Sequence, residues 1–321
     1  MLCDRKWTVW AFGLFLVMLS GCAVGQTFQG NYFLNMEEYD KGVEEFSKQL
    51  RENPDDPLAN YYMGRLLLAR EEPQKAMPHL QKALTLDPGK AEYHYWAGVG
   101  HWALGQSAKE RGRYQKALEL SPGHVPARVY LGHNFQDAGE LSKALEHYKE
   151  ALKKEPSHPE ALYNRALVLQ KMDRKEQEVS AWKEYLDHYP DGPLARNAAQ
   201  YLNARGDFSY RLHGLGNRRV VLEWIEFLPG TATLHPDAGP SLQVVGEMLQ
   251  KNEELKLAIE SYYTGNATLA RQRAEAVQEF LTRRYGVDPA RLPLESFGRA
   301  ERILAGENLY GLDHSIVFKT R

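Results

Sequence analysis

The sequence predicts an α-helical repeat solenoid followed by a smaller α+β domain, in which two helices cover a mixed sheet. Two observations predict this division. Prolines recur with a period of 34 residues through the first part of the chain, and such a period indicates stacked helical repeats. The period ends before Arg218, and strand-like segments then alternate with two segments of helical spacing. The periodic prolines are Pro54, Pro88, Pro122, Pro156 and Pro190.

The chain begins with a segment that is typical of a signal peptide. An uncharged run from Trp7 to Leu19 is shorter than the about 20 residues that span a bilayer. The run ends in Leu19-Ser20-Gly21-Cys22, which resembles the lipobox of bacterial lipoproteins. The resemblance implies that residues 1–21 are removed and that Cys22 carries acyl chains, which together hold a protein firmly to a membrane. Because Ala23 rather than an aspartate follows, the resemblance implies an outer-membrane anchor that faces the periplasm.

Composition argues against several classes of function. The chain has 40 basic and 42 acidic residues, so its charge predicts no nucleic-acid partner. Cys3 leaves with the signal peptide and Cys22 is taken by lipid, which excludes disulfides, thiol catalysis and cysteine metal sites. The sequence contains no His-Glu-x-x-His motif, phosphate loop or nucleophile elbow. We therefore expect a binding protein rather than an enzyme, with no cofactor and no metal site.

Each repeat pairs a small residue in its first helix with a bulky residue in its second. Small residues let two antiparallel helices approach closely, the bulky residue fills the space between them, and proline ends the second helix. The small residues are Gly30, Gly64, Gly98, Gly132 and Ala166, and the bulky residues are Phe46, Leu80, Tyr114, Tyr148 and Trp182. This pattern resembles the tetratricopeptide repeat. The resemblance implies about five repeats over residues 22–192, of which the first is the weakest.

Two features lie outside the regular pattern. Glu110 and Glu178 stand where the family usually has a small residue, so we expect those helix pairs to splay or the glutamates to extend outward to solvent. Residues 193–206 predict a capping helix with Leu194, Ala198 and Leu202 on one stripe. A solenoid needs such a terminal cap with a polar outer face.

The resemblance places a peptide-binding groove on the first helix of each repeat and implies protein partners in the cell envelope. Aromatic side chains there would supply a large contact area at a small entropic cost. The alternative is that some of them pack against neighbouring helices, and the sequence leaves both open. The groove positions are Tyr61, Arg65, Tyr95, Val99, Trp102, His133, Tyr163 and Leu167.

A glycine-rich stretch over residues 207–217 predicts a linker, and the second domain is expected over residues 218–321. Alternating or β-branched segments predict strands, and apolar residues at helical spacing predict two helices. The strands are expected at 218–227, 256–263 and 315–320, with a further strand near 296, and the helices at 241–251 and 266–281.

Three segments of this domain resemble the OmpA-like peptidoglycan-binding domain. They are "FLPGTATL" at 227–234, "NATLARQRAEAVQEFL" at 266–281 and "SFGRAE" at 296–301. In that family an aspartate and a helix arginine together hold the zwitterionic end of diaminopimelate. The resemblance implies a site of this type at Thr264, Asn266 and Arg273, with Thr264 where the aspartate should be. Loss of that carboxylate removes a charge-assisted bond of about 1.5–3 kcal/mol.

Two interpretations of the second domain stay open. Glu260 or Asp313 could supply the missing acid, in which case the domain binds peptidoglycan and tethers the outer membrane to the cell wall. The other interpretation is that the fold persists as a protein-binding module. We favour the second, and the sequence then predicts an outer-membrane-anchored periplasmic scaffold or assembly lipoprotein that binds protein partners through its repeats.

Overall fold

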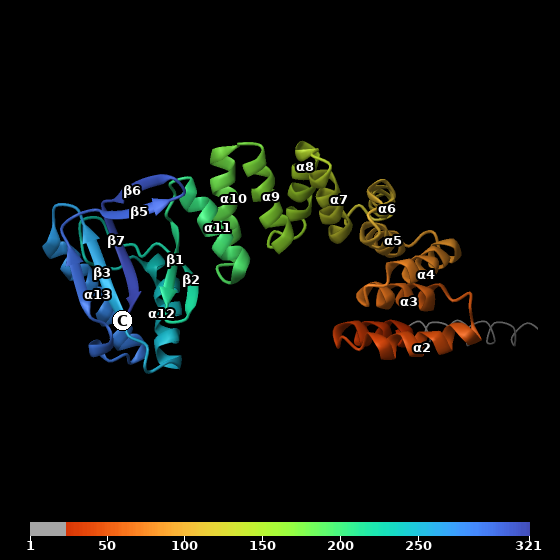
Figure 1. Ribbon diagram of the computed structural model, residues 1–321, viewed down its shortest axis with the longest axis horizontal. Helices are drawn as coiled ribbons and strands as arrows, with labels where there is room; N and C mark the ends of the chain where they lie inside the picture. Colours follow the sequence, from red (N-terminus) through yellow and green to blue (C-terminus); the bar gives the residue numbers. More distant parts are fainter. Residues whose placement is uncertain (1–23) are drawn as a thin grey trace, which may run out of the picture. The chain divides into compact units, whose positions relative to one another are not determined.

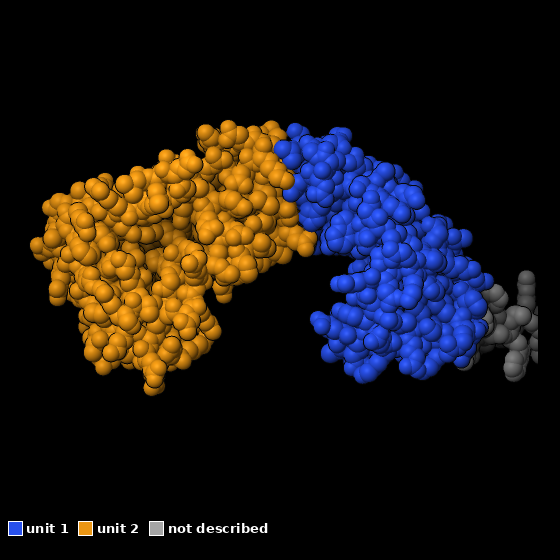
Figure 2. Space-filling view, in the orientation of Figure 1, with its two compact units in different colours: residues 1–156 blue, residues 157–321 orange. Residues whose placement is uncertain are grey.

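A computed structural model describes residues 24–321 of the chain. The predicted signal peptide and Cys22 lie outside these residues, so cleavage and acylation stay predictions. The chain divides into two compact units, residues 1–156 and residues 157–321 (Figure 2). The boundary falls before the fifth predicted repeat, so that repeat belongs to the same unit as the C-terminal domain. The two units are described in turn.

The first unit consists of helices that pack in consecutive pairs (Figure 1). Residues 24–35 form the first helix, and its Gln26 and Gln29 side chains hydrogen-bond Gln49 of the helix after it. The others are α2 (Tyr39–Glu52), α3 (Pro57–Ala69), α4 (Pro73–Leu86), α5 (Ala91–Ala103), α6 (Ser107–Leu120), α7 (Val125–Asp137) and α8 (Leu141–Leu152). The four helix pairs confirm the predicted repeats of this unit.

The small and bulky residues of the repeats meet as expected. A Cβ atom on Gly64 would lie 2.5 Å from Leu80, and one on Gly132 would lie 2.7 Å from Tyr148. The bulky residues are fully buried, which explains why a side chain at the facing position is excluded. The first repeat differs, because Gly30 faces the Tyr62 ring of α3 instead of Phe46.

Burial of Glu110 and Glu178 corrects one expectation. Glu110 is 4% exposed and Glu178 is 0% exposed, so neither extends to solvent. Glu178 is held by an ion pair with Arg205, at 2.7 Å between Oε2 and Nη2. Burial raises the pKa of Glu110, and a hydrogen bond with Asn134 opposes that rise. The two carboxylates stay inside because polar partners from neighbouring helices reach them.

The second unit begins with three helices. They are α9 (Pro159–Lys171), α10 (Lys175–His188) and α11 (Gly192–Ala204). The third occupies the place of the predicted capping helix, but its buried residues are Ala195, Ala198, Ala199 and Leu202, while Leu194 is 47% exposed. It packs on α10 and also contacts the first strand of the C-terminal domain. Helix α11 therefore packs on the last repeat at the place of the predicted cap and also joins that repeat to the C-terminal domain.

The predicted linker is wrong over most of its length. Residues Tyr210–Leu215 form β1, which pairs antiparallel with β2 (Arg218–Glu223). Gly216 lies in the connecting turn with a φ of +61°, a conformation that suits glycine. The glycines that indicated a flexible segment are thus residues of a β-hairpin. The strand expected over 218–227 correspondingly ends at Glu223.

A mixed three-stranded sheet forms the centre of the C-terminal domain, as predicted. Strand β3 (Leu257–Tyr263) runs parallel to β4 (Leu294–Phe297) and antiparallel to β7 (His314–Thr320). Helices α12 (Gly239–Lys251) and α13 (Ala267–Tyr285) pack on it through a buried core. The core includes Leu242, Val245, Leu249, Leu257, Ile259, Val277, Leu281 and Phe318. Two short 3-10 helices, η1 (Pro236–Ala238) and η2 (Pro289–Arg291), precede α12 and β4.

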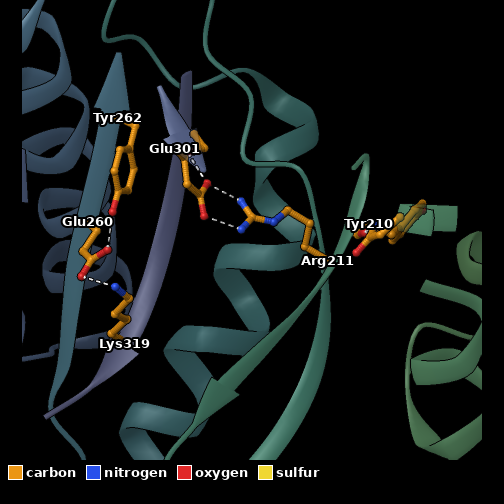
Figure 3. A network of polar contacts seen from close by, with 8 residues as sticks. Tyr210, Arg211, Glu260, Tyr262, Glu301 and Lys319 are labelled. Carbon is orange, nitrogen blue, oxygen red and sulfur yellow. Dashed lines mark hydrogen bonds and ion pairs between the residues drawn. The ribbon is translucent and has the colours of Figure 1, made fainter. Parts of the chain in front are cut away.

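A second hairpin, which the sequence did not predict, lies between β4 and β7. It consists of β5 (Glu301–Ala305) and β6 (Asn308–Leu312). Glu301 accepts two hydrogen bonds from the guanidinium of Arg211 on β1, at 2.8 and 2.6 Å, and one from Ser315 on β7 (Figure 3). This bidentate pair joins the two hairpins, and the Ser315 hydrogen bond connects them to the central sheet.

Candidate functional site

The predicted groove residues fall into three classes of exposure. Tyr61 and Tyr95 are 4% and 8% exposed, and Trp102 is 57% exposed. The remaining positions, Arg65, Val99, His133, Tyr163 and Leu167, are half-buried. Tyr61 and Tyr95 occupy the same position in successive repeats, and both rings contact the next helix pair. These two tyrosines pack, whereas the half-buried and exposed positions leave surface for a ligand.

Tyr61 and Arg65 form one fixed arrangement on α3. The Tyr61 ring stacks on Tyr93 with centroids 4.9 Å apart, and its hydroxyl accepts a hydrogen bond of 3.0 Å from Arg65 Nη1. The Arg65 guanidinium lies 4.3 Å from the centre of the Trp96 ring. A cation over an indole face is favourable, and here it spans two neighbouring repeats. Arg65 is thus held in place before any partner arrives.

Glu92, on α5, connects three repeats through its carboxylate. It accepts hydrogen bonds from Trp96 Nε1 at 2.8 Å and from the Tyr61 hydroxyl at 3.2 Å, and its Oε2 lies 2.9 Å from His124 Nε2. The hydrogen bond with His124 is the main cause of the lowered pKa of Glu92, and burial opposes it. Glu92, Trp96 and His124 are not among the predicted groove positions. Their only signal was the spacing of four residues that places Glu92 and Trp96 on one helix face.

A run of aromatic contacts continues this arrangement toward α8. The Tyr130 ring lies 5.7 Å from Tyr95 and 5.3 Å from His133, and His133 lies 5.6 Å from Tyr148. We define the repeat face as the surface positions of this set together with the predicted groove positions Val99 and Trp102 of the same unit: Arg65, Glu92, Trp96, Val99, Trp102, His124, Tyr130 and His133. It combines aromatic rings with both signs of charge. Contacts within the repeats hold six of these side chains, namely Arg65, Glu92, Trp96, His124, Tyr130 and His133.

In the fifth repeat, the two predicted groove residues have a different environment from those of the repeat face. The Tyr163 ring on α9 contacts Trp182 at 5.1 Å and Tyr185 at 5.2 Å, both on α10. Tyr163 is therefore mainly a packing residue of its own helix pair. Leu167 is half-buried one turn further along α9. Both stay predicted groove positions, and Tyr163 also has a side-chain hydrogen bond with Asn197 on α11.

In the C-terminal domain, Arg273 lies on α13, Asn266 immediately precedes that helix, and Thr264 lies just after β3. The Asn266 side chain caps the helix by accepting the backbone N–H of Leu269 at 2.9 Å. Arg273 is 5% exposed, and its Nε donates to the backbone carbonyl of Thr231 at 2.9 Å. Burial lowers the pKa of Arg273. Asn266 and Arg273 thus both bond to backbone, the first to the start of the helix and the second to a neighbouring loop.

Two aromatic rings enclose the Arg273 guanidinium. It lies 4.6 Å from the centre of the Phe227 ring and 4.9 Å from that of Tyr263. Phe227 begins the segment 227–234, which forms a loop closed by a bridge between Phe227 and Leu234 rather than a strand. Within residues 24–321, Arg273 forms no ion pair within 4.0 Å. The guanidinium therefore supports this loop through a hydrogen bond and ring contacts.

The structure distinguishes the two acids proposed for the missing carboxylate. Glu260 is 4% exposed, pairs with Lys319 at 2.7 Å and accepts the Tyr262 hydroxyl at 2.9 Å (Figure 3). The Glu260 carboxylate is therefore already bonded to side chains of the sheet. Asp313 is exposed, and its Oδ1 accepts a hydrogen bond of 3.1 Å from the Thr264 hydroxyl. A carboxylate thus reaches the position that the resemblance gave to aspartate, but it comes from the start of β7.

His314 lies beside this carboxylate. Its ring stacks on Tyr263 at 6.0 Å and contacts the edge of Trp224 at 5.7 Å. Burial, reinforced by the positive charge of Arg273, lowers the pKa of His314, while Asp313 and Glu226 act in the opposite direction. The charges of Arg273 and Asp313 thus both act on His314 at this end of the sheet.

One further group of polar side chains lies nearby. Glu226, His235 and Asp237 each place a possible ligand atom within 4.8 Å of the others, and the two acids are exposed. No sequence prediction covers this group, because its residues show no metal-ligand spacing. Among the helices of residues 24–321, none is both long and apolar enough to cross a bilayer.

Comparison with protein families gives matches over most of the chain. Two families are described as "Tetratricopeptide repeat": one matches residues 29–91 and 63–125, and the other matches residues 160–192. A third, described as "TPR repeat", matches residues 132–173. The family described as "OmpA family" matches residues 226–308. A comparison with curated proteins gives no match.

Solved structures show the same fold in the repeats. PilF of Pseudomonas aeruginosa is 16% identical, with a TM-score of 0.52, over 58% of this chain and 87% of the other. PilW, described as a widely conserved type IV pilus biogenesis factor, is 18% identical, with a TM-score of 0.51, over 57% of this chain and 86% of the other. Likeness at this identity shows the fold alone.

Proposed function

We propose that this chain, which carries tetratricopeptide repeats over residues 29–192 and an OmpA family domain over residues 226–308, is a non-catalytic envelope scaffold that binds a protein partner through its repeat face. The lipobox-like Leu19-Ser20-Gly21-Cys22 supports an anchor in the outer membrane, with the repeats in the periplasm. Repeats of this family suit protein binding, and the OmpA family suits attachment within the envelope. Both parts of the chain therefore point to a structural role rather than to chemistry.

The prearranged repeat face is the observation that carries this proposal. Arg65, Glu92 and Trp96 are fixed by hydrogen bonds and ring contacts, so a partner would not have to order them. Trp102 extends from α5 with 57% of its surface exposed. Tryptophan and arginine are the residues that most often dominate protein interfaces. We therefore assign the main contact to Trp102, supported by Arg65.

Affinity capture of the full acylated chain from detergent-solubilised envelopes tests this assignment. Truncation of a central tryptophan weakens the binding free energy by about 2 kcal/mol or more, which is roughly a thirtyfold loss of affinity. Trp102→Ala should therefore release an envelope protein that the wild type retains. Lys116→Ala, at an exposed site on α6, should retain it. Recovery of the same proteins with Trp102→Ala would contradict the assignment.

Peptidoglycan binding is the alternative, and the contact between Asp313 and Thr264 favours it. The Asp313 carboxylate could face the ammonium group of a zwitterionic ligand near Arg273. Against it, Arg273 is 5% exposed, with its Nε bonded to Thr231 and its guanidinium between two rings, which leaves it less available to a ligand carboxylate. We therefore place the protein-binding role first.

Sedimentation with purified sacculi distinguishes the two roles. If the domain holds the cell wall, the wild-type chain sediments and Asp313→Asn does not. Glu253→Gln is a matched control, because Glu253 is also exposed in the same domain. We expect no sedimentation of the wild-type chain, and sedimentation that depends on Asp313 would support the alternative.

A further inference from the structure

The first helix of the chain exposes a row of large apolar side chains. Val24, Phe28, Tyr32 and Met36 are 70%, 74%, 43% and 61% exposed. They are spaced four residues apart, so they follow one ridge along the helix of residues 24–35 and the turn after it. Single exposed apolar residues are ordinary on protein surfaces, whereas a continuous row indicates a contact surface.

The opposite side of this helix is firmly packed, which fixes the direction of the apolar row. Gly30 lies against the Tyr62 ring, and Phe33 and Leu34 pack on the buried core of the first repeats. Gln26 Nε2 donates to Asp56 at 2.8 Å, and Gln29 accepts a hydrogen bond of 2.9 Å from Gln49. The helix cannot turn its apolar row inward without losing these contacts.

The exposed face also lacks charge. Residues 23–36 contain no aspartate, glutamate, lysine or arginine, although 26% of the whole chain is charged. The terminal repeat of a solenoid normally needs a polar outer face to remain soluble. An uncharged and apolar outer face at this end therefore requires a cover.

We propose that the anchor face, formed by residues 24–36, lies in the interfacial layer of the lipid bilayer. The proposal rests on the lipid anchor of the proposed function, and it adds a second attachment beside it. Val24 is two residues after Cys22, which places the helix start within about 7 Å of the acyl chains. An interfacial helix buries its apolar face about 5–10 Å deep, within reach of that distance. The half-exposed Tyr32 suits the headgroup region, where tyrosine is enriched.

Two attachments would change how the repeats stand on the membrane. Acyl chains on Cys22 alone would leave the first repeat free to swivel about a short tether. Contact through Val24, Phe28 and Met36 in addition would hold the first repeat flat on the bilayer and fix which side of it faces the periplasm. Because the face is uncharged, its contact with lipid should not depend on anionic headgroups or on salt.

Accessibility of a nitroxide label in vesicles tests the proposal. In the acylated full chain, Cys22 is blocked by lipid, so Phe28→Cys supplies a single free thiol for the label. Glu44→Cys, an exposed position on α2 of the same repeat, is the matched control. The vesicles contain phosphatidylcholine, alone or mixed with phosphatidylglycerol. We expect the label at position 28 to collide more with oxygen and less with a water-soluble nickel chelate than the label at 44, in both compositions.

Each other outcome overturns the proposal for a distinct reason. If the protein floats with the vesicles but both labels meet the nickel chelate equally, the lipid anchor stands and the anchor face does not touch lipid. If the label at 28 is shielded from oxygen as well, protein covers the face, through a second copy or a partner. If the protein does not float with the vesicles, the anchor of the proposed function fails as well. Met36→Cys repeats the test at the other end of the row and excludes an effect peculiar to position 28.

Discussion

The carboxylate of Glu178 on α10 is completely buried and lies 2.7 Å from the guanidinium of Arg205, the residue that follows α11. The pair connects the last repeat to the helix that contacts β1 of the C-terminal domain. An unpaired buried carboxylate destabilises the folded state, so removal of the arginine should lower the stability of this part of the chain.

Arg205→Ala should lower the free energy of unfolding by about 3 kcal/mol, because it leaves Glu178 buried without its partner. The double variant with Glu178→Ala should recover most of the loss, since alanine occupies this position in other repeats, as at Ala76 and Ala144. Urea denaturation measures both, with Lys175→Ala as an exposed control. Equal loss in the single and double variants would contradict a role for the buried charge.

Two glycines of the third repeat should respond oppositely to alanine. A Cβ on Gly98 would clash with the Tyr114 ring, so Gly98→Ala should destabilise by about 1–3 kcal/mol. Gly112 on α6 has no atom within 4 Å of such a Cβ, so Gly112→Ala should stabilise by about 0.5–1 kcal/mol through helix propensity. Thermal unfolding followed by circular dichroism compares them, and the same sign for both would be inconsistent with this packing.

His213 on β1 should make stability depend on pH. Burial lowers its pKa to about 3, and its ring contacts Phe318. Below the ordinary pKa of histidine the unfolded chain binds a proton that the folded chain excludes, so stability falls as the pH falls toward 3. Each excluded proton contributes up to about 1.4 kcal/mol per pH unit. Urea unfolding between pH 6.5 and 4 should show a shallower slope for His213→Leu, while the exposed His188→Leu should keep the wild-type slope.

Arg273 should matter more for the structure of the 227–234 loop than its neighbour Arg271. Arg273→Ala removes a hydrogen bond from a charged donor to Thr231, worth about 1.5–3 kcal/mol, together with two ring contacts. Arg271 is exposed and pairs with Glu275 one turn away, so Arg271→Ala should cost at most about 0.5 kcal/mol. Hydrogen exchange should accelerate in the loop for the first variant alone. Equal exchange in both variants would mean that Arg273 does not hold the loop.

The repeats could be predicted because a small residue and its bulky partner recur in every repeat. Gly98 and Tyr114 belong to columns that are visible without any knowledge of the fold. The hairpin of β1 and β2 could not be predicted in the same way. Gly214 and Gly216 indicate a linker by composition, and only the pairing of Tyr210 with Glu223 shows that they belong to a hairpin.

The two sites depended on contacts between residues distant in the sequence. Asp313 reaches Thr264 because Tyr263 pairs with His314 across β3 and β7, and a single sequence does not fix that register. Glu92 and Trp96 share a helix face by spacing, but His124 joins them from the next repeat. The sequence therefore indicated the aromatic content of the repeat face but not the carboxylate that organises it.

A photo-crosslinking amino acid at position 102, in cells that make the acylated full chain, tests the central claim most directly. The account predicts that ultraviolet light links position 102 to a discrete envelope protein, while the same group at the exposed Lys116 position on α6 gives no such product. If the two positions give the same products, or if position 102 gives none, the repeat face is not the binding surface of a scaffold.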